Sequence, residues 1–106
     1  MELPIEFENK IEKLFALCNK YNVTKLFVFG SIVKGNFNPK TSDIDLIVEL
    51  EDLPPSEKGE KIMNLWTELE LLFSRKVDLL SNLNIKNPYL KKEIENSKYL
   101  LYDRAS

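Results

Sequence analysis

The sequence of 106 residues contains no histidine, only one cysteine and only three glycines. Its net charge at pH 7 is only −2. Without imidazole there is no common proton shuttle, no histidine-dependent triad and no typical zinc site. A single cysteine, Cys18, cannot form an internal disulfide, and the small net charge offers no general basic surface for direct nucleic-acid binding. Any chemistry must therefore use carboxylates, hydroxyls, lysines and metal ions.

Long hydrophobic runs are also missing, since no stretch approaches the roughly 20 apolar residues that span a bilayer. The chain does not open on a charged segment followed by an apolar one, so we expect a cytoplasmic protein with no membrane association. Its composition, 43% hydrophobic and 30% charged, is typical of a globular protein. The length predicts a single domain over residues 1–106, with no room for a separate substrate domain.

The hydrophobic periodicity predicts a small α/β (α+β) fold in which a short mixed sheet packs against helices. Apolar residues at helical spacing predict three helices, over residues 4–20, 57–73 and 87–97. Short runs rich in β-branched and aromatic residues predict three strands, over residues 24–30, 43–50 and 76–81.

The connecting segments are rich in turn-forming residues. Residues 31–35 are expected to form a turn or a short helix, and "NFNPKTS" (36–42) an exposed loop. In the polar segment 51–59, Ser56 is the expected N-cap of the following helix. An Asn-Pro pair at Asn87 is the expected start of the last helix.

Two acids stand two residues apart in "SDIDLIVEL", at the start of the second predicted strand. Because side chains alternate along a strand, Asp43 and Asp45 should project to the same side while their apolar neighbours enter the core. If the strand over residues 76–81 lies beside this one, Asp78 joins them. The spacing therefore predicts a cluster of three carboxylates.

Such a cluster is unfavourable unless a cation offsets it. Two unit charges about 4 Å apart repel by roughly 4 kcal/mol at an effective dielectric constant of about 20. Oxygen ligands without histidine or paired cysteines indicate Mg²⁺ or Mn²⁺ rather than zinc. Two ions about 3.5 to 4 Å apart are the usual arrangement where a nucleotidyl group is displaced in line.

The first predicted strand ends in a Gly-Ser pair that suits a phosphate group. Gly30 allows the backbone to approach closely, the Ser31 hydroxyl can donate a hydrogen bond, and Lys34 can add a positive charge. Taken singly, each feature is more often structural: a turn, a strand edge, a solvated lysine. Their conjunction with the acids, in this order, indicates a site for a metal-bound nucleotide.

The stretch "GSIVKGNFNPKTSDIDLIV" resembles the G-S-x-x-x-G, loop, S-D-x-D-L signature of the DNA polymerase β nucleotidyltransferase superfamily. The small size, with "RKVDLLS" and then "IKNPYLKKEIENSKYLLYD", narrows the resemblance to the minimal nucleotidyltransferase (MNT) proteins of prokaryotes. It covers the chain from about Thr24 to Asp103. The resemblance implies the small nucleotidyltransferase fold.

The resemblance also implies roles for individual residues. Asp43, Asp45 and Asp78 would bind metal and act in catalysis, with Asp78 helping to deprotonate the acceptor hydroxyl. The donor, ATP, would be held by residues of the signature: Gly30, Ser31, Lys34 and Ser42. Such enzymes transfer a nucleoside monophosphate to a hydroxyl and release pyrophosphate.

The sequence departs from the family pattern in two places. The family often has Arg where Lys34 stands, which keeps the charge but removes the bidentate geometry. The loop between Gly35 and Ser42 is slightly long, a change that costs little because loop-closure entropy grows slowly with length.

Related MNT proteins are typically antitoxins of HEPN-domain ribonuclease toxins, and some inactivate the toxin by adding AMP to a tyrosine. The resemblance therefore implies a protein adenylyltransferase in a hetero-oligomer with a HEPN partner. Two alternatives stay open: an antitoxin that acts by complex formation alone, and nucleotidyl transfer to a small molecule. The last usually requires an additional domain to hold the acceptor.

Overall fold

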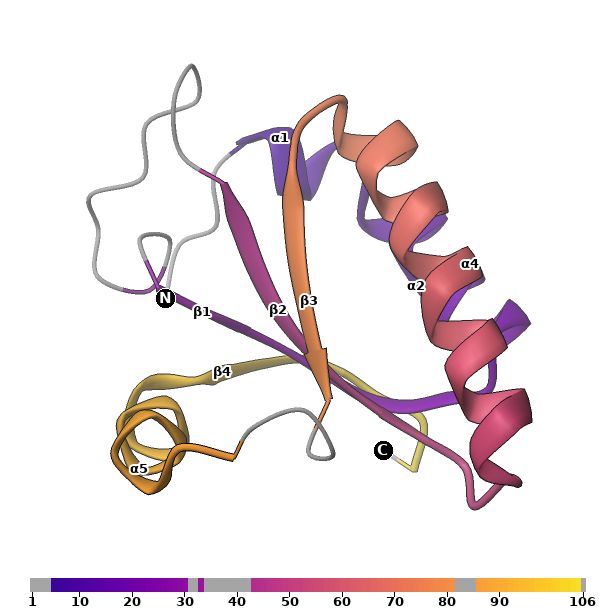
Figure 1. Cartoon of the computed structure of the whole chain (residues 1–106). Helices are drawn as coiled ribbons and strands as arrows, with labels where there is room; N and C mark the ends of the chain where they lie inside the picture. Colours follow the sequence, from indigo (N-terminus) through magenta and orange to yellow (C-terminus); the bar gives the residue numbers. More distant parts are fainter. Residues whose placement is uncertain (1–4, 31–32, 34–42, 82–85, 106) are drawn as a thin grey trace.

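The computed structural model of the chain describes residues 5–30, 33, 43–81 and 86–105, and it contains a mixed four-stranded sheet with helices on both faces (Figure 1). The strands are β1 (Val23–Phe29), β2 (Ile44–Leu50), β3 (Val77–Ser81) and β4 (Tyr99–Asp103). The helices are α1 (Ile5–Glu8), α2 (Ile11–Lys20), α4 (Pro55–Phe73) and α5 (Pro88–Ser97).

The strands lie in the order β3-β2-β1-β4. β1 pairs antiparallel with both β2 and β4, whereas β2 and β3 are parallel. The parallel pair is possible because the long helix α4 carries the chain back from the end of β2 to the start of β3. The predicted mixed sheet is confirmed, and the pairing of β2 with β3 meets the condition for Asp78 to join Asp45.

The main core lies between the sheet and the α2–α4 layer. Leu26 and Leu46 of the sheet are fully buried there against Leu14 of α2 and Leu65 and Leu69 of α4. Trp66 is partly buried against this core, and its indole N–H donates to the Val77 carbonyl at 2.5 Å. The prediction that the apolar stripe of this helix forms core is confirmed.

A smaller cluster occupies the other face of the sheet. Phe27 of β1 and Ile47 of β2 pack there against Ile94 of α5, with Phe29 and Leu80 partly buried beside them. Figure 1 shows α5 alone on this side, opposite α2 and α4. The described part of this face is therefore less completely covered by helices than the other.

The predicted helix over residues 4–20 is two helices, because the chain turns at Asn9 and Lys10 between α1 and α2. The apolar period continues through this turn, since Phe7 and Leu14 are both fully buried. The apolar stripe is therefore buried on both sides of the turn, although the helix itself is interrupted there.

The prediction of Ser56 as N-cap is wrong. The helix begins at Pro55, with Pro54 at the N-cap position, and no side chain caps it. Proline has the backbone angle that the first helical turn requires and lacks the N–H that would be unsatisfied there. The start of α5 is as predicted: the Asn87 side chain accepts hydrogen bonds from the backbone N–H groups of Tyr89 (2.9 Å) and Leu90 (3.3 Å).

The strand β4 was not predicted from the sequence. Tyr99–Asp103 reads "YLLYD", too short and too uniformly apolar to show a period of two. It becomes a strand by pairing with β1 at the sheet edge, where Lys25 lies opposite Asp103. The predicted turn over residues 31–35, apart from Val33, and the loop over 36–42 lie outside the described residues.

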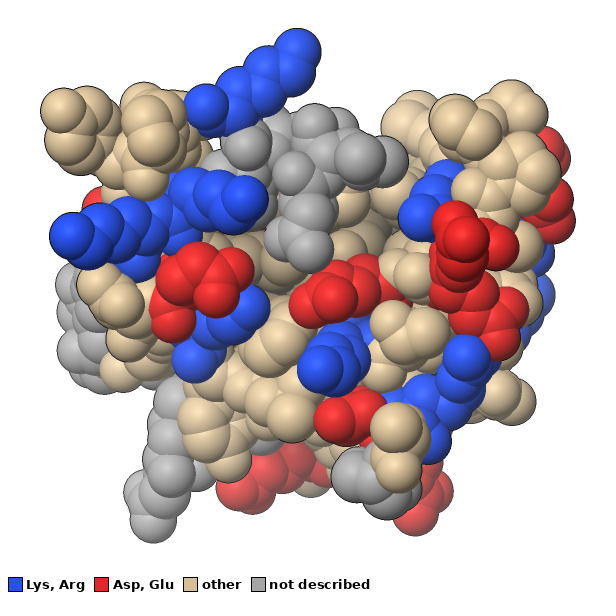
Figure 2. All heavy atoms as spheres, turned by 90° about the horizontal axis from the view of Figure 1, so that it is seen from below, with Lys and Arg blue, Asp and Glu red and all other residues tan. Residues whose placement is uncertain are grey.

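Charges of both signs are mixed on the face seen in Figure 2, where Lys and Arg side chains stand next to Asp and Glu. Among the described residues, Lys98 forms an ion pair with Glu95 at 3.1 Å, and Arg104 forms one with Glu51. This face carries no continuous basic surface among the described residues. None of the helices in the described residues combines the length and the hydropathy that a membrane span requires.

The position of two leucines of α4 predicts different losses of stability when each is replaced by alanine. Leu69 is fully buried, whereas Leu71 is 74% exposed. Leu69→Ala should lower the free energy of unfolding by about 2 to 5 kcal/mol, because it leaves a cavity as well as losing buried apolar surface. Leu71→Ala should stay within about 0.5 kcal/mol of wild type. Urea denaturation of both variants measures the difference, and equal losses would contradict this core.

Candidate functional site

The pairing of three strands brings Gly30, Asp45 and Asp78 to one end of the sheet. Phe29, the last residue of β1, lies opposite Asp45 of β2 in the antiparallel pair. Asp45 in turn lies beside Asp78 of β3 in the parallel pair. Residues that are far apart in the sequence thus become direct neighbours across the sheet.

Alternation along the strands determines which face the acids occupy. Ile44 and Leu46, on either side of Asp45, are fully buried in the main core. Val77 and Leu79 flank Asp78 in the same way. Both carboxylates therefore project from the opposite face, away from α2 and α4. There they are only partly buried, as is Asp43 just before β2.

Gly30 makes room for the Asp45 carboxylate. A Cβ atom placed on Gly30 would lie 2.3 Å from Oδ2 of Asp45, far inside contact distance. The backbone at Gly30 also has a φ of +76°, in the left-handed region that favours glycine. A side chain at this position would displace the acid and strain the backbone.

The position of Asp45 raises its pKa from 3.8 to about 6. Burial is the largest cause, followed by the negative charge of Asp78, a side-chain hydrogen bond with Asp78 and the charge of Asp43. A carboxyl group among other carboxyl groups is held toward its protonated form until a cation compensates the charge. The negative charges of Asp78 and Asp43 both act on Asp45, as the predicted repulsion requires.

These residues fit a hard divalent cation by their chemistry. Their donors are carboxylate oxygens, as Mg²⁺ and Mn²⁺ prefer. No group of three or more Asp, Glu, His or Cys side chains is arranged to hold a metal ion within the described residues. Mg²⁺ is usually bound by one or two carboxylates together with substrate phosphates and water, and Asp45 beside Asp78 provides such a partial set.

The sequence matches the family described as "Polymerase beta, Nucleotidyltransferase" over residues 9–106. The chain belongs to this family. It is 38% identical over 79 residues, 74% of this chain and 77% of the relative, to a protein of Methanocaldococcus jannaschii named "Putative protein adenylyltransferase MJ1379". Family and relative together make the protein a nucleotidyltransferase.

Solved structures show the same fold. A chain of a toxin-antitoxin crystal structure with AMP-PNP superposes with a TM-score of 0.65 and 22% identity, covering 88% of this chain and 73% of that one. Another belongs to a complex of a tri-AMPylated Shewanella oneidensis HEPN toxin with its MNT antitoxin, with a TM-score of 0.57, 19% identity and coverage of 92% and 73%. This chain therefore has the minimal nucleotidyltransferase fold.

The structure tests the placement of only some predicted nucleotidyltransferase residues. It brings Asp45, Asp78 and Gly30 together, and it places Asp43 near enough for its charge to act on Asp45. The other predicted nucleotide contacts, Ser31, Lys34 and Ser42, lie outside the described residues.

Sequence reasoning missed the contribution of α5. A small pocket of about 110 Å³ lies beside Gly30 and is lined by Phe29 and Gly30 together with Leu90, Glu93, Ile94 and Ser97 of α5. The helical spacing of Leu90 and Ile94 was visible in the sequence. What it could not show is that this face of the helix meets the end of β1.

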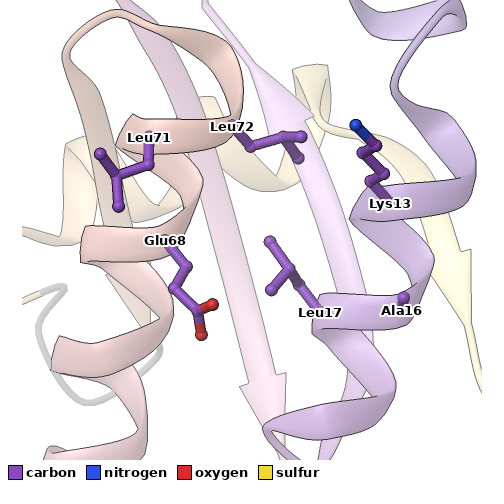
Figure 3. A pocket seen from close by; sticks show the side chains of 6 residues that line it. All are labelled: Lys13, Ala16, Leu17, Glu68, Leu71 and Leu72. Atoms are coloured by element: carbon purple, nitrogen blue, oxygen red, sulfur yellow. The ribbon is translucent and has the colours of Figure 1, made fainter.

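A larger groove, of about 420 Å³, lies between α2 and α4 and is separate from the nucleotidyltransferase site. Figure 3 shows Leu17 and Glu68 facing each other across it. It lies in the helical layer on the opposite face of the sheet from Asp45. Glu68 accepts hydrogen bonds from Lys20 (3.3 Å) and from the Tyr21 hydroxyl, so its charge is already compensated.

The raised pKa of Asp45 predicts how stability depends on pH when no metal is present. The folded state binds this proton more tightly than the unfolded state, so the associated stability is fully present below pH 3.8 and is lost as the pH rises through about 6. Asp45→Asn replaces the carboxyl group with an amide that does not ionise, so the variant does not lose this stability as the pH rises. In EDTA, the variant should be more stable than wild type near neutral pH by about 1 kcal/mol, since Asp45 remains partly exposed.

Thermal unfolding at several pH values measures this effect. A gain of about 1 kcal/mol raises Tm by about 4 to 8 °C in a domain of about 100 residues, and the gain should vanish below about pH 4. Asp52→Asn, at an exposed acid before α4, is the matched control and should change Tm little at any pH. An Asp45→Asn gain that did not depend on pH would contradict this assignment.

Proposed function

We propose that this protein is a Mg²⁺-dependent adenylyltransferase that transfers AMP from ATP to a tyrosine hydroxyl of a HEPN-domain ribonuclease toxin. The observation that carries the proposal is that Gly30 lies against the Asp45 carboxylate, with Asp78 beside Asp45 on the next strand. In the family signature these positions belong to the nucleotide donor and the metal ions. The named activity of the M. jannaschii relative supports protein as the acceptor class. The two toxin-antitoxin structures support the partner and the donor.

In this proposal Asp43, Asp45 and Asp78 hold the divalent ions, of which two are expected. When bound, the ions neutralise charge on the phosphates and on the acceptor oxygen. Asp43 supplies carboxylate oxygens from the residue just before β2, Asp45 from β2 itself and Asp78 from the neighbouring strand. Gly30 leaves space at the Asp45 carboxylate, and the family signature assigns Ser31, Lys34 and Ser42 to the triphosphate.

The proposed reaction transfers AMP from ATP to the acceptor hydroxyl in one step. The acceptor hydroxyl oxygen forms a bond to the α-phosphorus of ATP, and the bond from that phosphorus to the oxygen bridging to the β-phosphate breaks. Pyrophosphate leaves with the electron pair of the broken bond. Asp78 receives the proton of the acceptor hydroxyl, which makes it the general base. Asp78 suits this role because it lies on the far side of Asp45 from Gly30.

A protein acceptor also agrees with how the helices are arranged on the sheet. Among the described helices only α5 covers the face that carries Asp45 (Figure 1), and we propose that the partner approaches this face. We therefore place the protein in a cytoplasmic hetero-oligomer with its HEPN partner, with the acceptor tyrosine supplied by that partner.

Intact-mass spectrometry tests the proposal directly. A co-expressed HEPN-domain partner is incubated with the wild-type protein, ATP and Mg²⁺, and in parallel with the Asp43→Asn/Asp45→Asn variant. We expect wild type to add whole AMP units to the partner and the double variant to lose at least about 100-fold in rate, because the carboxylates that hold the ions are gone. Asp52→Asn is the matched acid control and should keep full activity.

Two outcomes would contradict the proposal. If the double variant modified the partner as fast as wild type, the carboxylates would not be the catalytic site. If wild type formed a tight complex with the partner but never added AMP, the protein would be an antitoxin that acts by binding alone.

A further inference from the structure

The pocket between the end of β1 and α5 has a composition suited to a flat ring. Phe29 contributes an aromatic ring, and Leu90 and Ile94 contribute aliphatic surface. Glu93 and Ser97 line the same pocket with polar groups. The Ser97 hydroxyl donates to the Glu93 carbonyl at 2.8 Å, which leaves its oxygen free to accept a hydrogen bond from a ligand N–H.

The size of the pocket limits what it can hold. Its volume of about 110 Å³ is somewhat smaller than the roughly 150 Å³ of an engineered cavity that binds benzene. It therefore suits a single ring system, partly inserted, and not a whole nucleotide or a helix of a partner protein. Base rings stack on aromatic side chains regardless of sequence because every base has a π-face.

The position of the pocket points to the donor side of the site. Across the sheet the order is Asp78 on β3, Asp45 on β2 and then Phe29 and Gly30 at the end of β1. Gly30 lines the pocket and also lies against the Asp45 carboxylate. Asp78, assigned above to the acceptor hydroxyl, lies on the opposite side of Asp45. A ring in the pocket thus belongs to the molecule bound at Gly30.

We infer that this pocket holds the base ring of the donor nucleoside triphosphate, with α5 as the wall that recognises it. The inference rests on the proposed function, because it takes Gly30 as part of the triphosphate site. The helix α5 is then a specificity element, and not only a cover for Phe27 and Ile47.

Leu90→Trp tests the inference, because the larger side chain fills the pocket. Leu90 is 43% exposed, so the substitution does not enter the main core. Tyr89→Trp is the matched control: the same new side chain on the same helix, at a residue that is 86% exposed and is not among those lining the pocket. Circular dichroism and thermal unfolding establish that both variants are folded.

Binding of ATP and of inorganic tripolyphosphate is measured by calorimetry in Mg²⁺. Tripolyphosphate has the phosphates of ATP but no base. We expect Leu90→Trp to weaken ATP binding about tenfold or more and to leave tripolyphosphate binding unchanged. Tyr89→Trp should bind both like wild type.

The other outcomes separate the two proposals. If Leu90→Trp binds ATP like wild type, the base does not occupy the pocket, although the proposed function stands. If that variant binds ATP normally but modifies the partner slowly, the pocket belongs to the acceptor and the inference is overturned. An equal loss for ATP and tripolyphosphate would overturn it as well. If wild type binds neither ligand, the proposed function fails and the pocket assignment fails with it.

Discussion

Crowding of carboxylates at the end of the sheet is the constraint on which the site depends. Asp45 lies against Gly30 on one side and Asp78 on the other, and burial together with the neighbouring acids raises its pKa to about 6. No lysine or arginine of the described residues is among the causes that shift the pKa of Asp45. We therefore expect lower stability near neutral pH in the absence of metal, and carboxylate oxygens are the ligands that a hard divalent cation prefers.

The rest of the fold keeps this arrangement in place. The parallel pairing of β2 with β3 depends on α4, whose buried face packs on the sheet through Leu65 and Leu69. That packing lies entirely on the face opposite the acids. A stable core and an electrostatically unfavourable site therefore occupy the two sides of the same strands.

The sequence predicted those features that depend on local patterns. Alternation predicted that Asp45 projects away from the core while Ile44 and Leu46 enter it, and the Asn-Pro pair marked the start of α5. It did not predict β4, because a short edge strand is formed by pairing with β1 and has little signal of its own. The pocket beside Gly30 was missed for the same reason, since it arises where two distant segments meet.

The central claim is that Asp45 is held in a carboxylate cluster that a divalent cation completes. Carbon-13 NMR of the Asp45 carboxyl group, titrated with pH in the absence and presence of Mg²⁺ and a non-hydrolysable ATP analogue, tests it most directly. The account predicts a pKa of about 6 without metal and a value below the ordinary range for aspartate once metal and nucleotide are added. An ordinary pKa that does not respond to Mg²⁺ and nucleotide would contradict it.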